Sequence, residues 1–194
     1  MSCPCARQRQ ERDHPPYRVM AKSMPLPDLL VLAQLLSYDP ESGHFHWKKS
    51  ISKQKAGSKA GGITTAKRGL GKSYLQIRIN GKQYLAHRLA WLMHTGEDPL
   101  HYQVDHIDGN GLNNSFANLR LATKEQNAQN SAVRKTNTSG MKGAFFHKPS
   151  GYWLSAISVN GKRFYLGQFK TAEQAHDAYC KAAAELHGEF ARTA

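Results

Sequence analysis

The residues best suited to chemistry are an Asp-His pair and two asparagines that follow it, Asp105-His106, Asn118 and Asn127. Hydrolysis of a phosphodiester requires a base that deprotonates water and a cation that neutralises charge on the phosphorus and the leaving oxygen. Free histidine has a pKa of about 6.5, so His106 is suited to act as the base at neutral pH. Asp105 offers a hard carboxylate oxygen to a divalent cation, and Asn127 offers an amide oxygen. These are the residue types that metal-assisted hydrolysis of a phosphodiester needs.

The neighbouring sequence indicates how these residues are positioned. Thr123 and Gln126 have the spacing of a capping box, which predicts a helix that starts at Lys124 and carries Asn127 in its first turn. If Asp105 and His106 lie on a strand, their side chains point to opposite faces, so the strand must end in a bend for both to serve one site. An Asn-rich surface turn is the alternative, but it does not account for the spacings and the capping box together.

The segment from Val104 to Asn127 resembles the HNH endonuclease motif, in which a residue before the catalytic His, a central Asn and a final His or Asn recur at these spacings. The resemblance implies a ββα-metal fold and a divalent metal cofactor, Mg²⁺ or Mn²⁺. It also implies that Asp105 and Asn127 are metal ligands, that His106 is the catalytic base, and that Asn118 braces the loop and orients the base. Asn at the last position resembles the phage and intron-encoded branch of the family.

Other polar residues in the segment are assigned to the loop. We expect Asp108, Asn113 and Asn114 to form turns, with Asp108 as the next choice of metal ligand. Asn130 follows Asn127 by one helical turn and is a second candidate ligand, but we expect it to be solvated or part of a linker.

Positive charge is concentrated before this motif. The chain carries 27 Lys and Arg against 14 Asp and Glu, a net charge of +13, and no acidic residue lies between Ser42 and Gly96. Such a surface attracts a polyanion through counterion release. With no basic amphipathic helix to lie on anionic lipid, nucleic acid is favoured. The expected DNA contacts here are Arg78, Lys82 and Arg88.

His87 stands within Ala86 to Trp91, a segment that resembles the His-Arg segment preceding the metal motif in this nuclease branch. Because a His beside apolar helix positions is usually a packing residue, we expect His87 to be hydrogen-bonded and packed. Arg88 is then the better candidate for a phosphate contact.

Elements before the motif are predicted from periodicity and turn residues. We expect a helix within 26–36, a strand over 44–47, a loop rich in Gly, Lys and Ser over 50–72, and a helix over 87–93. Asn80-Gly81 between apolar runs predicts a hairpin, since this dipeptide readily adopts the positive φ angles of a tight turn.

The last 55 or so residues predict three strands and a helix. The strand-like runs are 143–146, 153–159 and 163–169, with Asn160-Gly161 as the second turn, and Thr171 with Gln174 is a capping box. The expected packing face of the helix is Ala175, Ala178, Tyr179, Ala182, Ala183 and Leu186.

This region resembles the APETALA2-type DNA-binding domain over most of 139–190, on the strength of Tyr165-Leu166-Gly167 with Phe169 and the Ala-rich helix. The resemblance implies a sheet that enters the major groove of DNA. Alternation places Trp153, Ile157, Val159, Phe164 and Leu166 against the helix, with Arg163 and Tyr165 outward. The expected DNA contacts are His147, Lys148, Lys162, Arg163 and Tyr165.

The middle strand departs from that pattern, because it turns Leu154, Ala156 and Ser158 outward where charged or long polar side chains are usual. From Gly140 onward there are seven basic and four acidic residues, so we expect weak DNA binding. A small protein-contact domain of the same fold is the alternative.

These observations predict an α+β protein, with a ββα-metal (HNH) nuclease region followed by a small three-stranded antiparallel sheet plus one helix. The expected organisation is a disordered basic N-terminus over 1–24, the nuclease region over 25–130, a linker over 131–138 and the APETALA2-like module over 139–194. We expect the module to be a flexible tether outside the active site. The implied partner is double-stranded DNA, and the resemblance is to homing or phage-encoded endonucleases. The alternative is a non-catalytic DNA-binding regulator with a vestigial metal motif.

Several other classes are disfavoured. The longest apolar stretch, 26–36, is too short and too interrupted to span a membrane, and the N-terminus lacks the apolar core of a secretory signal. Three cysteines, Cys3, Cys5 and Cys180, provide neither a disulfide framework nor paired zinc knuckles. An intracellular, cytoplasmic protein without a small-molecule cofactor is therefore expected, and its oligomeric state carries no signal in the sequence.

Overall fold

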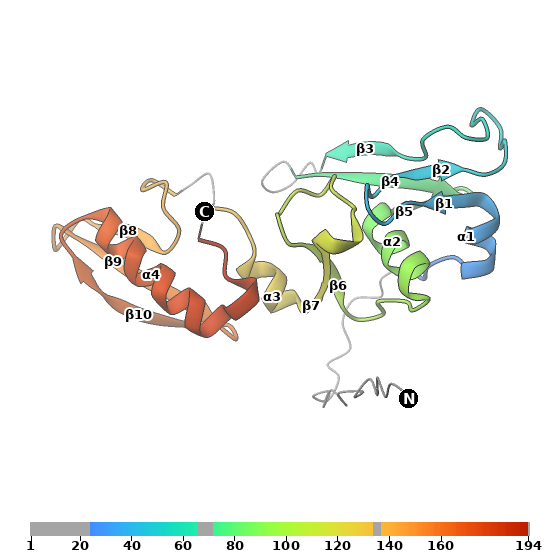
Figure 1. Ribbon diagram of the computed structural model, residues 1–194. Helices are drawn as coiled ribbons and strands as arrows, with labels where there is room; N and C mark the ends of the chain where they lie inside the picture. The colour runs from blue at the N-terminus through green and yellow to red at the C-terminus, as the bar shows by residue number, and fades with distance from the viewer. Residues whose placement is uncertain (1–23, 66–71, 134–136, 194) are drawn as a thin grey trace, which may run out of the picture.

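The computed structural model describes residues 24–65, 72–133 and 137–193 (Figure 1). The expected disorder of 1–24 lies outside the described residues except at Met24. The centre of the expected linker, 134–136, lies outside them too, as do Lys67 and Arg68 of the basic stretch. Within the described part, no helix is long and apolar enough to cross a membrane.

The first part of the chain builds two small antiparallel sheets and two helices. The elements are α1 (Leu29–Leu35), β1 (Leu36–Tyr38), β2 (Phe45–Trp47), β3 (Gly62–Thr65), β4 (Ser73–Ile79), β5 (Lys82–Leu85) and α2 (Ala86–Thr95). Strand β1 pairs with β2, and the second sheet has the order β3-β4-β5. The predicted hairpin turn is confirmed, since Asn80 and Gly81 have φ angles of 47° and 79°.

Apolar side chains from these elements form one core. Leu32 of α1, Ile77 of β4 and Leu89 of α2 are fully buried there, each with 0% exposure. Truncating such a side chain to Ala typically costs about 2–5 kcal/mol of stability. Val104 and Leu119 from the next pair of strands join the same core, so the strand that carries the Asp-His pair is anchored to it.

The central segment is a hairpin-like pair of strands followed by a short helix. Strand β6 (Gln103–His106) pairs antiparallel with β7 (Leu119–Ala122). The 3₁₀ turn η1 (Phe116–Asn118) directly precedes β7, and the helix α3 (Lys124–Gln129) follows it. The predicted capping box is confirmed: Thr123 accepts from the Gln126 backbone, and the Gln126 side chain accepts from the Thr123 backbone.

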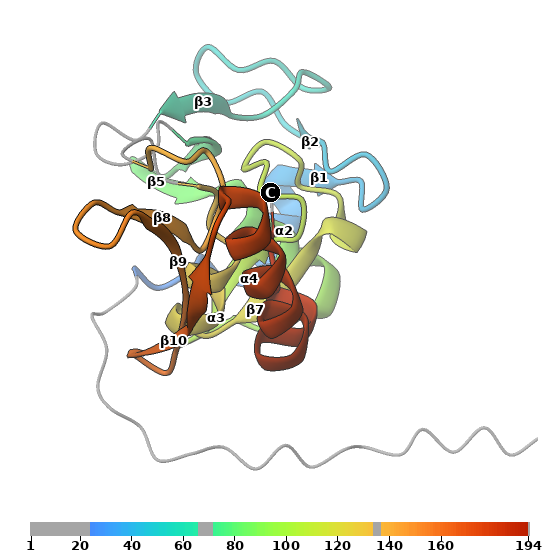
Figure 2. The ribbon, with the colours of Figure 1, turned by 90° about the vertical axis from the view of Figure 1, so that its left-hand side faces the viewer.

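The last part is the expected three-stranded antiparallel sheet with one helix across it (Figure 2). It contains β8 (Ala144–His147), β9 (Tyr152–Val159), β10 (Lys162–Phe169), α4 (Ala172–His187) and the 3₁₀ turn η2 (Gly188–Phe190). The strand order is β10-β9-β8. Ile157 of β9 packs against Tyr179 and Ala183 of α4.

Two side chains of this unit are more exposed than the periodicity predicts. Leu186 is 50% exposed, because the buried stripe of α4 continues from Ala183 to His187 at a spacing of four. Phe164 is 49% exposed, because β10 is an edge strand and covers less of the helix than the central β9.

Strand β3 lies in the region expected to be a loop. Its residues are mostly exposed, so it has no apolar alternation that would reveal a strand. It forms because its backbone pairs with the amino-terminal half of β4.

Candidate active site

Strand β6 presents Asp105 and His106 on opposite faces, and both are almost fully buried, at 6% and 5% exposure. Asp105 contacts β7 and the end of α3, whereas the His106 ring lies against His87 of α2, with 4.9 Å between ring centroids. The chain bends directly afterwards, where the Gly109 N–H donates to the His106 carbonyl over 2.9 Å. Alternation along the strand thus separates the two side chains, as the sequence predicts.

The hydrogen bonds that the Asp105 carboxylate accepts from the described residues all go to one of its two oxygens. Oδ2 accepts from Nε and Nη2 of Arg120, both at 3.1 Å, and from Nδ2 of Asn130 at 2.9 Å. Arg120 is the residue directly opposite Asp105 in the β6–β7 register. None of these three bonds involves Oδ1, and the role of Asp105 as a metal ligand stays a prediction.

Asn114 orients the imidazole of His106. Its Nδ2 donates to the Leu112 carbonyl over 3.2 Å, so its Oδ1 is the atom 3.3 Å from Nε2 of His106. An amide oxygen only accepts, which assigns the proton to Nε2 and leaves Nδ1 as the basic nitrogen. Burial lowers the pKa of His106, outweighing Asn114, Asp108 and Asp105, which raise it. His106 is therefore neutral at pH 7 and able to accept a proton.

The N-terminal hairpin holds Asn114 in place. Tyr38 Oη donates to the Asn114 carbonyl over 2.8 Å, and the backbone of Asn114 packs directly on Gly43. A Cβ at Gly43 would lie 2.3 Å from the Asn114 carbonyl carbon, so only glycine fits there. The sequence identified Asn114 only as a turn former, because no local spacing distinguishes it from the adjacent Asn113.

Asn118 closes the loop between β6 and η1. Its Nδ2 donates to Oδ1 of Asp108 and to the Asn113 carbonyl, and its Oδ1 accepts from the Asp108 backbone. Burial raises the pKa of Asp108, but hydrogen bonds from Asn113, the Asn110 backbone and Asn118 outweigh it, so the pKa is lowered. The Asp108 carboxylate is thus already used within the loop.

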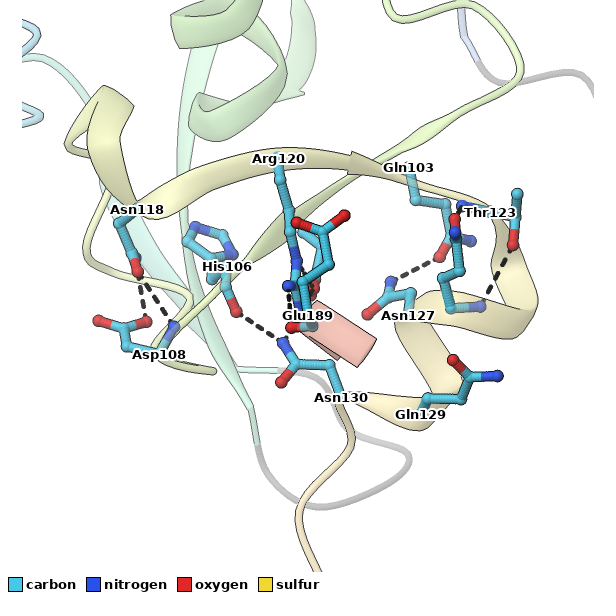
Figure 3. A network of polar contacts seen from close by, with 12 residues as sticks. Gln103, His106, Asp108, Asn118, Arg120, Thr123, Asn127, Gln129, Asn130 and Glu189 are labelled. Atoms are coloured by element: carbon cyan, nitrogen blue, oxygen red, sulfur yellow. Dashed lines mark hydrogen bonds and ion pairs between the residues drawn. The ribbon is translucent and has the colours of Figure 1, made fainter. Parts of the chain in front are cut away.

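The two asparagines of α3 and its C-cap have different neighbours (Figure 3). Nδ2 of Asn127 donates to Oε1 of Gln103 over 2.5 Å, at the start of β6. Asn130 instead donates to Asp105 and to the His106 carbonyl, the latter over 2.8 Å. The expectation that Asn130 is solvated is wrong, since it is 5% exposed. Oδ1 of Asn127 takes no part in the Gln103 bond, and its role as a metal ligand stays a prediction.

His87 packs beside the candidate base. Its ring also meets Tyr74, with 5.7 Å between centroids, and burial, followed by the charges of His106 and Arg88, lowers its pKa to about 3. The packing role agrees with expectation. The expected hydrogen bond is not found at Nδ1, which has no partner among the described residues.

The residues expected to contact DNA differ in their exposure and in their partners. Arg78 and Lys82 are exposed at the tip of the β4–β5 hairpin, whereas Arg88 is mostly buried and pairs with Asp98 at 3.4 Å. In the last unit, His147, Arg163 and Tyr165 share the sheet face away from α4, with Arg163 4.7 Å above the Phe145 ring. Lys162 begins β10, and Lys148 is exposed just after β8.

The donor set around Asp105 suits a hard cation with few protein ligands. Among the described residues no three His, Cys, Asp or Glu side chains come together as a metal site. Carboxylate and amide oxygens, such as those of Asp105 and Asn127, are ligand types that a cation such as Mg²⁺ accepts, and such a cation keeps several waters and also binds substrate phosphate oxygens. The residues present therefore fit such a cation.

Comparison with known proteins finds a family similar to the segment that contains the Asp-His pair. A family model described as HNH endonuclease matches residues 84–129, from β5 to the end of α3. The chain is 37% identical over 121 residues to Protein 3.8 of Escherichia phage T7, and the match covers 62% of this chain and 97% of that protein. It is 39% identical over 123 residues to Uncharacterized HNH endonuclease L560 of Acanthamoeba polyphaga mimivirus, with 63% of each chain covered.

Proposed function

This chain belongs to the HNH endonuclease family, and from that premise we propose that it hydrolyses phosphodiester bonds of double-stranded DNA with a divalent metal and with His106 as general base. The observation that carries the proposal is the pair of oriented groups on β6. Asn114 fixes Nε2 of His106 as the protonated nitrogen, and Arg120 with Asn130 holds Oδ2 of Asp105.

In this mechanism His106 takes the proton of a water molecule on Nδ1. Its burial keeps it neutral, and its bond to Asn114 satisfies Nε2–H before and after the transfer. A positioned general base typically contributes about 10²–10⁴-fold to the rate. When bound, the divalent cation supplies a Lewis acid that neutralises charge on the phosphate and on the leaving 3′ oxygen.

Asp105 and Asn127 are the residues that we propose to hold Mg²⁺ or Mn²⁺. Asn118 contributes indirectly, because it fixes the loop that follows His106. Three bonds to Oδ2 restrict rotation of the Asp105 carboxylate, as outer hydrogen bonds do for metal ligands generally.

DNA is proposed to follow the basic surface of the nuclease region, with Arg78, Lys82 and Arg88 as phosphate contacts. The last unit is proposed to be an APETALA2-type DNA-binding module that uses His147, Lys148, Lys162, Arg163 and Tyr165. The viral sources of both relatives support a phage-encoded or homing role.

A second candidate is a non-catalytic DNA-binding regulator. One observation favours it: Arg120 already neutralises Asp105 in the described structure. A nicking assay on supercoiled plasmid with Mg²⁺ or Mn²⁺, against an EDTA control, separates the two. Metal-dependent conversion to open-circle or linear DNA supports the nuclease, whereas DNA binding without conversion supports the regulator.

A further inference from the structure

Phe190, in the 3₁₀ turn η2, stacks on Arg120, the arginine that pairs with Asp105. The guanidinium carbon of Arg120 lies 3.8 Å from the centre of the Phe190 ring, and Nη1 of Arg120 donates to the Glu189 carbonyl over 2.5 Å. Phe190 is 4% exposed and Glu189 is drawn beside Arg120 in Figure 3. Arg120 is thus fixed on one side by Asp105 and on the other by η2.

A second contact reaches the asparagine that also holds Asp105. Nζ of Lys142 donates to the carbonyl oxygens of Gln129 and Ser131, over 2.6 and 2.8 Å. These two carbonyls flank Asn130. Lys142 itself belongs to the last unit, where its ammonium lies 6.0 Å from the centre of the Tyr179 ring of α4.

Both side-chain donors to Oδ2 of Asp105 are therefore held by the last unit. A long arginine side chain has many rotamers, and a C-terminal helix end frays easily, so each donor needs a partner to keep its position. We propose that the sheet-and-helix unit is a structural part of the nuclease site, in which Phe190 and Lys142 are positioning residues that keep Arg120 and Asn130 on Asp105.

This inference rests on the proposed function, and it replaces the expectation that the unit is a tether outside the active site. A tether would contribute only DNA affinity, through effective concentration. A positioning role instead predicts a loss of metal affinity at unchanged DNA affinity, because groups that orient a metal ligand typically change metal affinity about 10–100-fold.

The test uses full-length Phe190→Ala and Lys142→Met. Matched controls are Phe164→Ala and Lys181→Met, which change exposed residues of the same unit that make no described contact with Arg120 or Asn130. We measure the Mn²⁺ concentration for half-maximal nicking, DNA affinity in EDTA, and Mn²⁺ binding to the protein–DNA complex by calorimetry. We expect both test variants to need at least about 10-fold more Mn²⁺, with DNA affinity within about two-fold of wild type and both controls unchanged.

Conservative variants separate positioning from folding. Phe190→Trp keeps the aromatic face under Arg120 and Lys142→Arg keeps a donor, so both are expected to restore most of the Mn²⁺ affinity, whereas Phe190→Leu keeps bulk alone and is not. Variants that melt like wild type yet bind Mn²⁺ normally would overturn the inference, as would a loss confined to DNA affinity. If Phe190→Ala does not fold, Phe190→Leu decides the question. If the wild type binds Mn²⁺ but never nicks DNA, the proposed function fails, and calorimetry still tests the positioning role.

Discussion

At the scale of single residues, the buried Asn114 determines which nitrogen of His106 is basic. Sequence spacing alone identified His106 but not this partner, because the contact depends on a loop closed by Asn118 and supported by Gly43. Two polar networks lie on either face of β6, and Asn130 joins them because it donates both to Asp105 and to the His106 carbonyl. One orients the base, and the other orients the carboxylate.

Replacing His106 with Ala tests the first network. We expect the cleavage rate to fall by about 10²–10⁴-fold, since the variant lacks the proton acceptor, while DNA affinity stays close to wild type. Single-turnover nicking and a filter-binding titration in EDTA measure the two quantities. Activity within a few-fold of wild type would assign the base elsewhere.

His87 predicts how stability depends on pH. Its pKa is lowered to about 3 in the folded chain, so the unfolded chain binds the proton more readily. His87 therefore contributes stability above about pH 6.5, and this contribution is lost as the pH falls from there towards 3. The loss is already about 1 kcal/mol at pH 5.5.

Urea unfolding at pH 7.5 and 5.5 measures this contribution. His87→Leu should reduce the difference in unfolding free energy between the two pH values by about 1 kcal/mol. His44→Leu changes an exposed histidine and is the control. An unchanged difference in the His87 variant would mean that folding does not lower the pKa of His87.

At the scale of elements, α3 is short and depends on its cap. Thr123→Ala removes the acceptor of the Gln126 N–H, which typically costs about 1 kcal/mol of stability, and it loosens the helix that carries Asn127 and precedes Asn130. Thr171→Ala removes the matching cap of α4, away from the site. We expect similar losses of melting temperature in both, but slower nicking only in Thr123→Ala. Equal nicking rates would show that α3 does not position the site.

Local signals predicted the elements that local chemistry determines. Asn80-Gly81 and the Thr123 capping box could be read directly, because their backbone requirements involve only neighbouring residues. Strand β3 could not, because it forms through pairing with β4 and has no apolar face. Asn127 and Asn130 are three residues apart, so the sequence places both on the same side of α3. Only the packing of α3 on β6 determines that Asn130, and not Asn127, donates to Asp105. The stack of Arg120 on Phe190 joins residues that are far apart in the sequence, so no sequence motif predicts it.

At the scale of the whole molecule, positive charge is concentrated between Ser42 and Gly96, where no acidic residue occurs. The last unit meets the nuclease region at α3 (Figure 1), and its Phe190 stacks on Arg120. Affinity for DNA should then depend mainly on phosphate contacts made before the motif. The last unit should contribute to the site itself as well as to binding.

Replacing both Arg78 and Lys82 with Ala tests this division. If each contacts a phosphate, the slope of log K against log salt should become shallower by about 2, with affinity reduced equally on unrelated duplexes. Lys170→Ala with Lys181→Ala removes the same charge from exposed positions in the last unit. The same change of slope in both double variants would indicate a general charge effect without a defined phosphate track.

The contact of Phe190 with Arg120 also affects when the enzyme becomes active during its synthesis. A ribosome completes the Asp-His strand, its loop and α3 long before it reaches Phe190, and until then Arg120 and Asn130 lack the partners that hold them. A nascent chain would therefore carry every catalytic side chain without an assembled site. By the loss expected for Phe190→Ala, such a chain would need at least about 10-fold more Mn²⁺ to cleave DNA than the chain that includes η2.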